Sequence, residues 1–146
     1  IDEISKLHKR EYKFNDLSLE EANDKIKGLD SDILHMEFEI ENFNIMRYGL
    51  RIGGDNLGYS IRDNTFSYNE ESFKNKYLPE RGAKTISYEL IIDRTSIEVY
   101  VDNGRYTMVL PRNLDSKEKG LEFWLDNGTG LKIKNLNIYE MSSIWE

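Results

Sequence analysis

The chain of 146 residues contains no cysteine, and it has only two prolines and two histidines. Without cysteine it forms neither a disulfide framework nor a zinc site built on thiolates, and a chain of this length needs neither in order to fold. No apolar run approaches the ~18 residues that a membrane-spanning helix requires. The sequence begins at Ile1 rather than at methionine, so we expect it to be a piece of a longer protein.

Negative charge exceeds positive charge in this chain. The 20 lysines and arginines are outnumbered by 27 aspartates and glutamates, which leaves a net charge of −7. This charge repels the phosphates of nucleic acids and anionic lipid headgroups, so we expect neither a nucleic-acid partner nor a membrane partner. The length is typical of one domain, which can bury about 68–70% of the surface that its unfolded chain exposes.

Most signatures of catalysis are missing. There is no glycine-rich phosphate loop after a predicted strand and no Gly-x-Ser-x-Gly elbow. His35 alternates with apolar residues and is predicted to be a solvated side chain, while His8 has basic neighbours that disfavour a metal. The Asp-Asn-Gly triplets at 102–104 and 126–128 lack the rest of a calcium loop and are interpreted as turns. We therefore expect no catalytic residue, no metal and no cofactor.

What the sequence has in abundance is alternation of apolar and polar residues. From Leu34 to Glu41, every second residue is apolar, as in a strand with one buried face and one wet face. Nine tyrosines support packed strands and would also serve as a stacking surface. About ten short strands, without helices between them, predict an all-β fold of two stacked antiparallel sheets. The other segments with this pattern are 48–52, 59–62, 65–68, 88–92, 97–101, 106–110, 121–126 and 131–139.

Turn signals separate these segments. Asn103-Gly104 predicts a type I′ hairpin turn, because both residues tolerate a positive φ, and Asp63-Asn64 predicts a second tight hairpin. The apolar phase slips near Asn135, which predicts a β-bulge. Residues 69–84 are polar and irregular and are predicted to form a long loop.

One segment does not follow the strand pattern. Residues 18–21, Ser-Leu-Glu-Glu, have the spacing of a capping box, and Gly28 is a suitable helix stop. The intervening residues make about two and a half turns, too few to hold a helix without tertiary support. A short helix and a surface loop therefore both remain open.

Residues 92–105, with the sequence IDRTSIEVYVDNGR, resemble a hallmark of the C-terminal β-sandwich of glycoside hydrolase family 32. In that family the pattern Asp-Arg-Ser-Ser-Val-Glu-Val-Phe precedes a turn with Asn/Asp-Gly and a threonine-containing strand that ends in proline, here 106–111. Residues 119–128 and 131–141 are similar to the closing hairpin of the same domain. The resemblance implies a concanavalin/laminin-G-like jelly roll at 11–146, preceded by a linker at 1–10 from a missing catalytic propeller.

The resemblance also implies a role. The catalytic motifs of the family, Trp-Met-Asn-Asp-Pro-Asn, Arg-Asp-Pro and Glu-Cys, belong to that propeller, and none occurs here. The expected protein is a non-catalytic accessory domain of a fructan- or sucrose-hydrolysing glycosidase such as a levanase, inulinase or invertase. Its expected partners are a fructan or fructoside and the propeller of the same polypeptide. A bacterial extracellular or cell-surface location is favoured over the cytoplasm.

The sandwich is also similar to carbohydrate-binding module family 66, which recognises terminal fructose. That similarity implies a site in which Trp124 stacks on a sugar ring while charged side chains bind its hydroxyls. The residues that it implies for carbohydrate binding are Arg51, Tyr59, Glu98, Tyr100, Trp124 and Asp126.

A structural role is the alternative for the same residues. The charged side chains then form cross-strand ion pairs, Trp124 is buried against the propeller, and the domain stabilises the propeller or pairs subunits without binding sugar. This alternative requires an exposed apolar patch on the isolated domain. The candidates for that patch are Ile1, Ile4, Leu7, Ile144 and Trp145.

Overall fold

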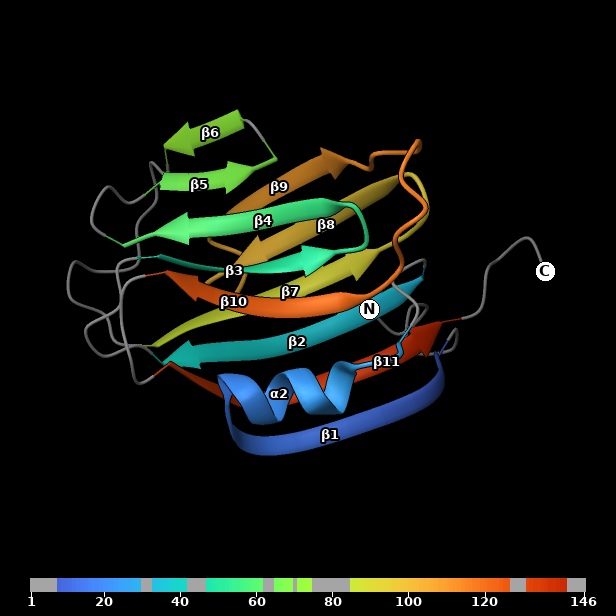
Figure 1. The fold of residues 1–146 in the computed structure, drawn as a ribbon. Helices are drawn as coiled ribbons and strands as arrows, with labels where there is room; N and C mark the ends of the chain where they lie inside the picture. The colour runs from blue at the N-terminus through green and yellow to red at the C-terminus, as the bar shows by residue number, and fades with distance from the viewer. Residues whose placement is uncertain are drawn as a thin grey trace.

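The computed structural model describes residues 8–29, 33–41, 47–61, 65–69, 71–74, 85–126 and 131–141. Two antiparallel sheets lie face to face (Figure 1), which confirms the predicted all-β sandwich. The six-stranded sheet has the order β1-β11-β2-β7-β8-β9, and the five-stranded sheet has the order β10-β3-β4-β5-β6. The strands of the larger sheet are β1 (His8–Ser18), β2 (Leu34–Glu41), β7 (Thr85–Ile92), β8 (Ser96–Val101), β9 (Tyr106–Pro111) and β11 (Lys132–Met141). Those of the smaller sheet are β3 (Arg47–Ile52), β4 (Asp55–Ser60), β5 (Thr65–Tyr68), β6 (Glu71–Lys74) and β10 (Leu121–Asp126).

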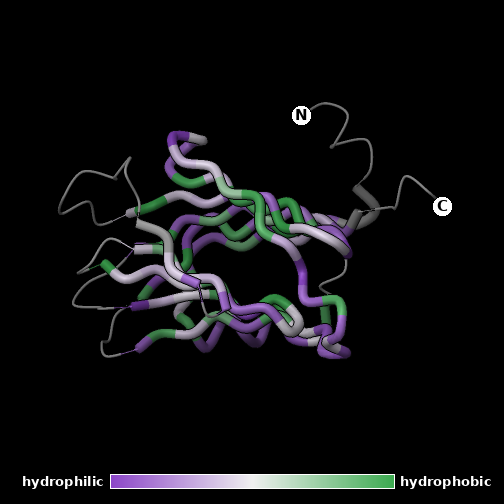
Figure 2. Tube along the Cα trace, turned by 90° about the horizontal axis from the view of Figure 1, so that it is seen from above, coloured by the Kyte–Doolittle hydropathy of each residue, from purple (hydrophilic) through white to green (hydrophobic). Residues whose placement is uncertain are grey.

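The hydrophobic core lies between the two sheets. Figure 2 shows the two layers of the backbone from above. The alternating apolar residues of the sequence point inward, so that Met36, Leu90 and Val99 have no exposed surface. Aromatic rings join the layers: the ring of Phe38 on β2 meets that of Phe123 on β10 edge-on, with 5.2 Å between their centroids. Burial of this interface therefore stabilises both sheets at once.

A buried polar contact lies within this core. The hydroxyls of Tyr48 on β3 and Tyr88 on β7 form a hydrogen bond across the interior. Burial raises the pKa of both hydroxyls, since an ionised phenolate would lose its hydration there. Each hydroxyl thus has its partner in the opposite sheet, and the pair links the two sheets through the core.

The segment left open as helix or loop is a helix, α2 (Leu19–Ile26). The hydroxyl of Ser18 accepts from the amide of Glu21 at 3.2 Å, and the Glu21 carboxylate accepts from the amide of Ser18 at 3.2 Å. Nδ2 of Asn23 donates to the carbonyl of Phe123 at 2.9 Å, and Oδ1 of Asn23 accepts from the amide of Phe123 at 2.7 Å. These two hydrogen bonds attach α2 to the edge strand β10. Within the described residues, no helix is long and apolar enough to cross a membrane.

The turn predictions have mixed outcomes. Asn103 and Gly104 have φ of 58° and 85° with a hydrogen bond across them, and the register shift between Lys134 and Asn137 is the predicted bulge. The prediction of a loop throughout 69–84 is wrong at residues 71–74, where β6 adds an edge strand to β5. The hairpin tip at Asp63-Asn64, residues 75–84 and 127–128, and the five candidates for an apolar patch lie outside the described residues.

The segment that carries the family resemblance begins with a structural turn. Between β7 and β8, one carboxylate oxygen of Asp93 accepts from the amide of Thr95 at 2.7 Å, from its hydroxyl at 3.0 Å and from the amide of Ser96 at 2.8 Å. Partial burial raises the pKa of Asp93, but these hydrogen bonds outweigh it and hold the pKa below its ordinary value of 3.8. The motif therefore holds a hairpin together.

Replacing Asp93 by alanine should lower the free energy of unfolding by about 1 kcal/mol near pH 7, because the turn loses its shared acceptor. Since the pKa is lower in the folded state, ionised Asp93 contributes stability above about pH 4, and this contribution is lost as the pH falls through the folded pKa. Urea unfolding of the parent, Asp93→Ala and the control Asp93→Asn at neutral pH and near pH ~3 checks this. A difference between parent and Asp93→Ala that stays constant with pH would contradict it.

Candidate functional site

Trp124 lies on the outer face of the five-stranded sheet, above two paired glycines. The strand register places Trp124 opposite Gly49, and Gly49 opposite Gly58. A Cβ atom added to Gly49 would lie 2.5 Å from Cζ2 of the indole, and one added to Gly58 would lie 3.0 Å from it. The six-membered ring of the indole therefore rests on the bare backbone of β3 and β4, which only glycine allows.

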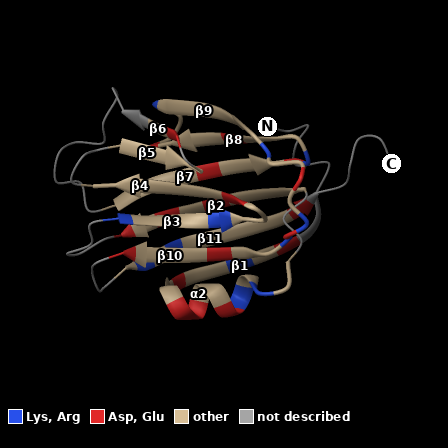
Figure 3. Cartoon of the chain, turned by 45° about the horizontal axis from the view of Figure 1, so that its top comes forward, with Lys and Arg blue, Asp and Glu red and all other residues tan. Residues whose placement is uncertain are grey.

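Polar side chains surround the half-buried indole. Its Nε1 donates to Oδ1 of Asn56 at 2.7 Å. The guanidinium carbon of Arg47 lies 5.5 Å from the ring centroid, and Arg47 Nη1 lies 3.8 Å from the Asp126 carboxylate. At the other end of β3, Arg51 donates to the Glu122 carboxylate at 2.9 Å. Figure 3 shows these charges at both ends of β3 and β10. We call Trp124 and these five side chains the Trp124 surface.

The charged groups of the Trp124 surface remain open to solvent. The side chains of Arg47 and Asp126 are 46% and 51% exposed, and those of Arg51 and Glu122 are 57% and 56% exposed. Exposed ion pairs of this kind contribute little stability, about 0–1 kcal/mol each. These charged groups can therefore replace their ion pairs with hydrogen bonds to a ligand at a small cost in free energy.

The structure brings together three of the six residues predicted to bind carbohydrate, namely Arg51, Trp124 and Asp126. Tyr59 is elsewhere: its side chain is 5% exposed and points into the core, 4.6 Å from the ring of Phe66. Because Gly58 faces outward, the strand alternation turns Tyr59 inward. Burial also raises the pKa of its hydroxyl.

Glu98 and Tyr100 lie on the opposite face of the molecule. Both point outward from β8 in the six-stranded sheet, where the Tyr100 hydroxyl donates to Glu98 at 3.5 Å. Burial, followed by the charges of Glu98 and Glu89, raises the pKa of Tyr100. Tyr100 lines a groove of about 370 Å³ together with Glu89 and Asn137. The two faces are separated by the core, so these residues and Trp124 do not contact one sugar ring together.

Sequence reasoning missed three members of the Trp124 surface, Arg47, Asn56 and Glu122. The available signal was Gly49 and Gly58, because a glycine at an outward strand position marks a place where something large approaches the backbone. The prediction of a solvated His35 is wrong. The residue is 5% exposed, packs against Tyr139 with 5.3 Å between ring centroids, and forms a 2.7 Å contact with Glu89.

A two-sheet antiparallel fold that carries an aromatic side chain among charged groups on an outer face belongs to the class of β-sandwich domains with an exposed candidate ligand surface. Within that class, the sequence model of the family "Glycosyl hydrolases family 32 C terminal" matches residues 3–140. The chain belongs to this family. It is 24% identical over 168 aligned residues to the levanase of Bacillus subtilis (strain 168), an alignment that covers 99% of this chain and 24% of the levanase.

Solved structures show the same fold. The β-fructofuranosidase of Schwanniomyces occidentalis, complexed with fructosyl-erythritol, superposes with a TM-score of 0.69 at 12% identity over 93% of this chain and 34% of its own. The exo-inulinase of Aspergillus awamori superposes with a TM-score of 0.62 at 13% identity over 97% of this chain and 31% of its own. The sucrose-6-phosphate hydrolase of Lactobacillus gasseri superposes with a TM-score of 0.61 at 13% identity, over 99% of this chain and 30% of its own. The chain thus spans between a quarter and about a third of the proteins that it resembles.

Proposed function

We propose that this chain is a non-catalytic accessory domain that binds terminal fructosyl units of a fructan on the Trp124 surface. The observation that carries the proposal is the indole of Trp124, laid over Gly49 and Gly58 with arginines and carboxylates at both ends. A non-catalytic role is supported by the absence from the sequence of the propeller motifs to which the family resemblance assigns catalysis.

The chemistry of the surface suits a small sugar. An indole face stacks on the C–H groups of a ring, while a guanidinium and a carboxylate hold neighbouring hydroxyls in a fixed orientation. Fructosyl sugars are the first choice because the similar proteins include a levanase, an exo-inulinase and a fructofuranosidase bound to fructosyl-erythritol.

Calorimetric titration of the chain with levan, inulin, sucrose and fructose tests this proposal. We expect saturable binding of at least one fructan, with fructose as a weaker competitor, because a terminal-unit site recognises one ring and part of the next. Glucose and cellobiose serve as controls for non-specific stacking. A folded protein that binds none of the four fructosyl sugars would refute the sugar-binding function.

A structural function is the second candidate, favoured by an open edge of the sandwich. Val109 on β9 is 71% exposed, and Leu114 just after β9 is 72% exposed. Val109 also lines a groove of about 920 Å³ with Met108 and Tyr68. This function predicts that the longer protein melts at a lower temperature when the domain is deleted or when Val109 and Leu114 are replaced by serine. Unchanged melting and an unchanged mass in light scattering would exclude it.

A further inference from the structure

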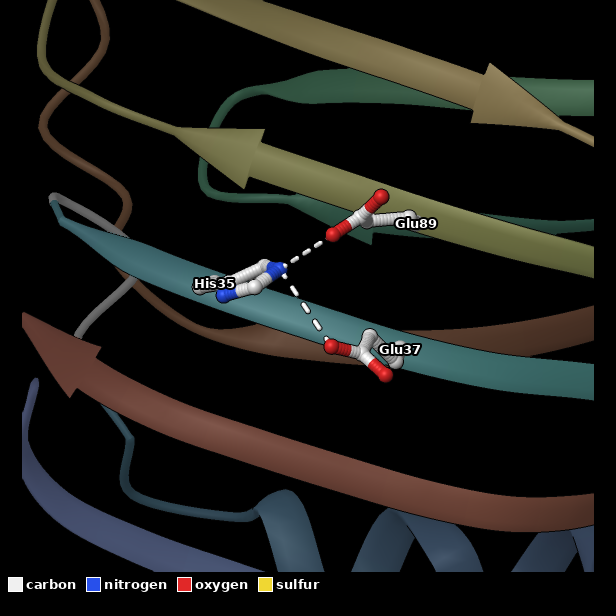
Figure 4. A group of neighbouring side chains, drawn as sticks. All are labelled: His35, Glu37 and Glu89. Atoms are coloured by element: carbon white, nitrogen blue, oxygen red, sulfur yellow. Dashed lines mark hydrogen bonds and ion pairs between the residues drawn. The ribbon is translucent and has the colours of Figure 1, made fainter. Parts of the chain in front are cut away.

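Three potential metal ligands converge on the outer face of the six-stranded sheet, away from the Trp124 surface. Figure 4 shows the imidazole of His35 directed at the carboxylates of Glu37 and Glu89. Nε2 of His35 lies 2.7 Å from Oε2 of Glu89 and 3.6 Å from Oε1 of Glu37. The three donor atoms all lie within 4.8 Å of one another. We call these three residues the His35 triad.

The strand pairing forces the two carboxylates together. Glu37 is two residues after His35 on β2 and therefore shares its face, and Glu89 on β7 is directly opposite Glu37. Like charges opposite each other in a sheet repel. The contact at 2.7 Å is a hydrogen bond with Glu89, whereas the 3.6 Å separation from Glu37 is too long for one. The His35 contact therefore reaches only one of the two opposed carboxylates at hydrogen-bonding distance.

The imidazole is held in place while the carboxylates can move. The His35 side chain is 6% exposed and is covered by the ring of Tyr139 from β11. The side chains of Glu37 and Glu89 are 44% and 37% exposed. A fixed nitrogen donor with two adjustable oxygen donors is a suitable start for a metal site.

We propose that the His35 triad binds one zinc ion. Zinc accepts imidazole nitrogen and carboxylate oxygen at about 2.0–2.2 Å, which places neighbouring donors of a tetrahedral site about 3.3 Å apart. The two nitrogen–oxygen separations of 2.7 and 3.6 Å bracket that value, and the two carboxylate oxygens lie within 4.8 Å of each other, so movement of the partly exposed glutamate side chains would complete the geometry. A doubly charged ion also neutralises both carboxylates. The imidazole favours zinc over calcium and magnesium, which prefer oxygen donors alone.

Three protein ligands leave one tetrahedral position open. Glu37 and Glu89 both line the groove of about 370 Å³ that also contains Ser87 and Tyr100. The open position therefore has room for water or for a hydroxyl-bearing ligand. This proposal does not depend on sugar binding at the Trp124 surface, because the two sites lie on opposite outer faces.

Titration of the chelator-treated chain with zinc chloride, followed by calorimetry and by metal analysis after dialysis, tests the proposal. We expect one zinc ion per chain. His35→Gln and Glu89→Gln should each weaken binding by at least about tenfold, since loss of even an outer partner of a ligand costs that much. Cobalt should give the intense visible absorption of a tetrahedral site in the parent and lose it in these variants.

Two controls make the result specific. His8→Gln removes the other histidine of the chain, and Glu122→Gln removes a carboxylate on the opposite face; both should bind zinc as the parent does. Glu37→Gln removes a ligand at a half-exposed position, so this variant should fold. It replaces His35→Gln in the test if His35→Gln does not fold. The proposal is overturned if zinc binding is not saturable, if Glu37→Gln and Glu89→Gln bind as tightly as the parent, or if His8→Gln abolishes binding.

Discussion

Replacing Arg112 by methionine should lower the free energy of unfolding by about 3–5 kcal/mol, the usual cost of leaving a buried charge without its partner. Arg112 follows β9 of the six-stranded sheet, and its Nε donates at 2.8 Å to the carboxylate of Asp55 on β4 of the other sheet. The two side chains are 8% and 1% exposed. The substitution keeps most of the aliphatic length of the side chain but leaves the carboxylate buried and uncompensated.

The effect should extend beyond one ion pair because Arg112 connects several segments. Its Nη1 donates at 2.9 Å to the carbonyl of Asp93, and its own amide donates at 2.9 Å to the carbonyl of Thr95. The Asp55 carboxylate also accepts from the amide of Asn113 and from the Asn69 side chain, each at 3.1 Å. Loss of the guanidinium therefore weakens the link between the β7–β8 turn and the opposite sheet.

Unfolding in guanidinium chloride, followed by circular dichroism, measures the free energy of unfolding of the parent and of Arg112→Met. Arg51→Met is a matched control, because the same side chain is lost from an ion pair whose partners are more than half exposed, and it should cost less than about 1 kcal/mol. The double variant Asp55→Asn/Arg112→Met should recover part of the loss, since no full charge then remains buried. Equal effects of Arg112→Met and Arg51→Met would show that the buried pair is not a link between the sheets.

The fold could be predicted from the sequence because strand alternation is a local signal. The inward positions of β2, from Leu34 to Ile40, follow from period two alone, and the capping box of Ser18 and the bulge near Asn135 are equally local. Two strands, β1 and β6, were not predicted. Most residues of β1 are polar or charged, and β6 has only four residues next to a loop, so both carry too weak a pattern.

The site could be predicted only in part, because alternation says whether a side chain points outward but not from which sheet. Glu98 and Trp124 are both outward residues, and only the long-range pairing of β8 with β7 and of β10 with β3 puts them on opposite faces. The ion pair of Asp55 with Arg112 and the burial of His35 depend in the same way on strands distant in sequence. Contacts between strands far apart in the chain leave no local pattern in one amino-acid sequence.

Replacing Trp124 by alanine should weaken binding of the preferred fructan by about 2 kcal/mol, or roughly 30-fold, because the stacking surface is removed and only bare glycine backbone remains. The variant should stay folded, since the indole lies outside the core on the sheet surface. Calorimetric titration of the parent and the variant, with circular dichroism to verify folding, measures the effect.

Two further variants separate the outer faces and separate binding from stability. Tyr100→Ala removes an aromatic side chain from the opposite groove and should leave fructan binding unchanged. Arg51→Met should weaken binding by about tenfold while costing little stability, because its exposed guanidinium is available to a sugar hydroxyl. Binding that survives Trp124→Ala but is lost in Tyr100→Ala would move the sugar site to the groove beside the His35 triad. Zinc would then be expected to change the affinity for sugar, since the open metal position and the sugar would share that groove.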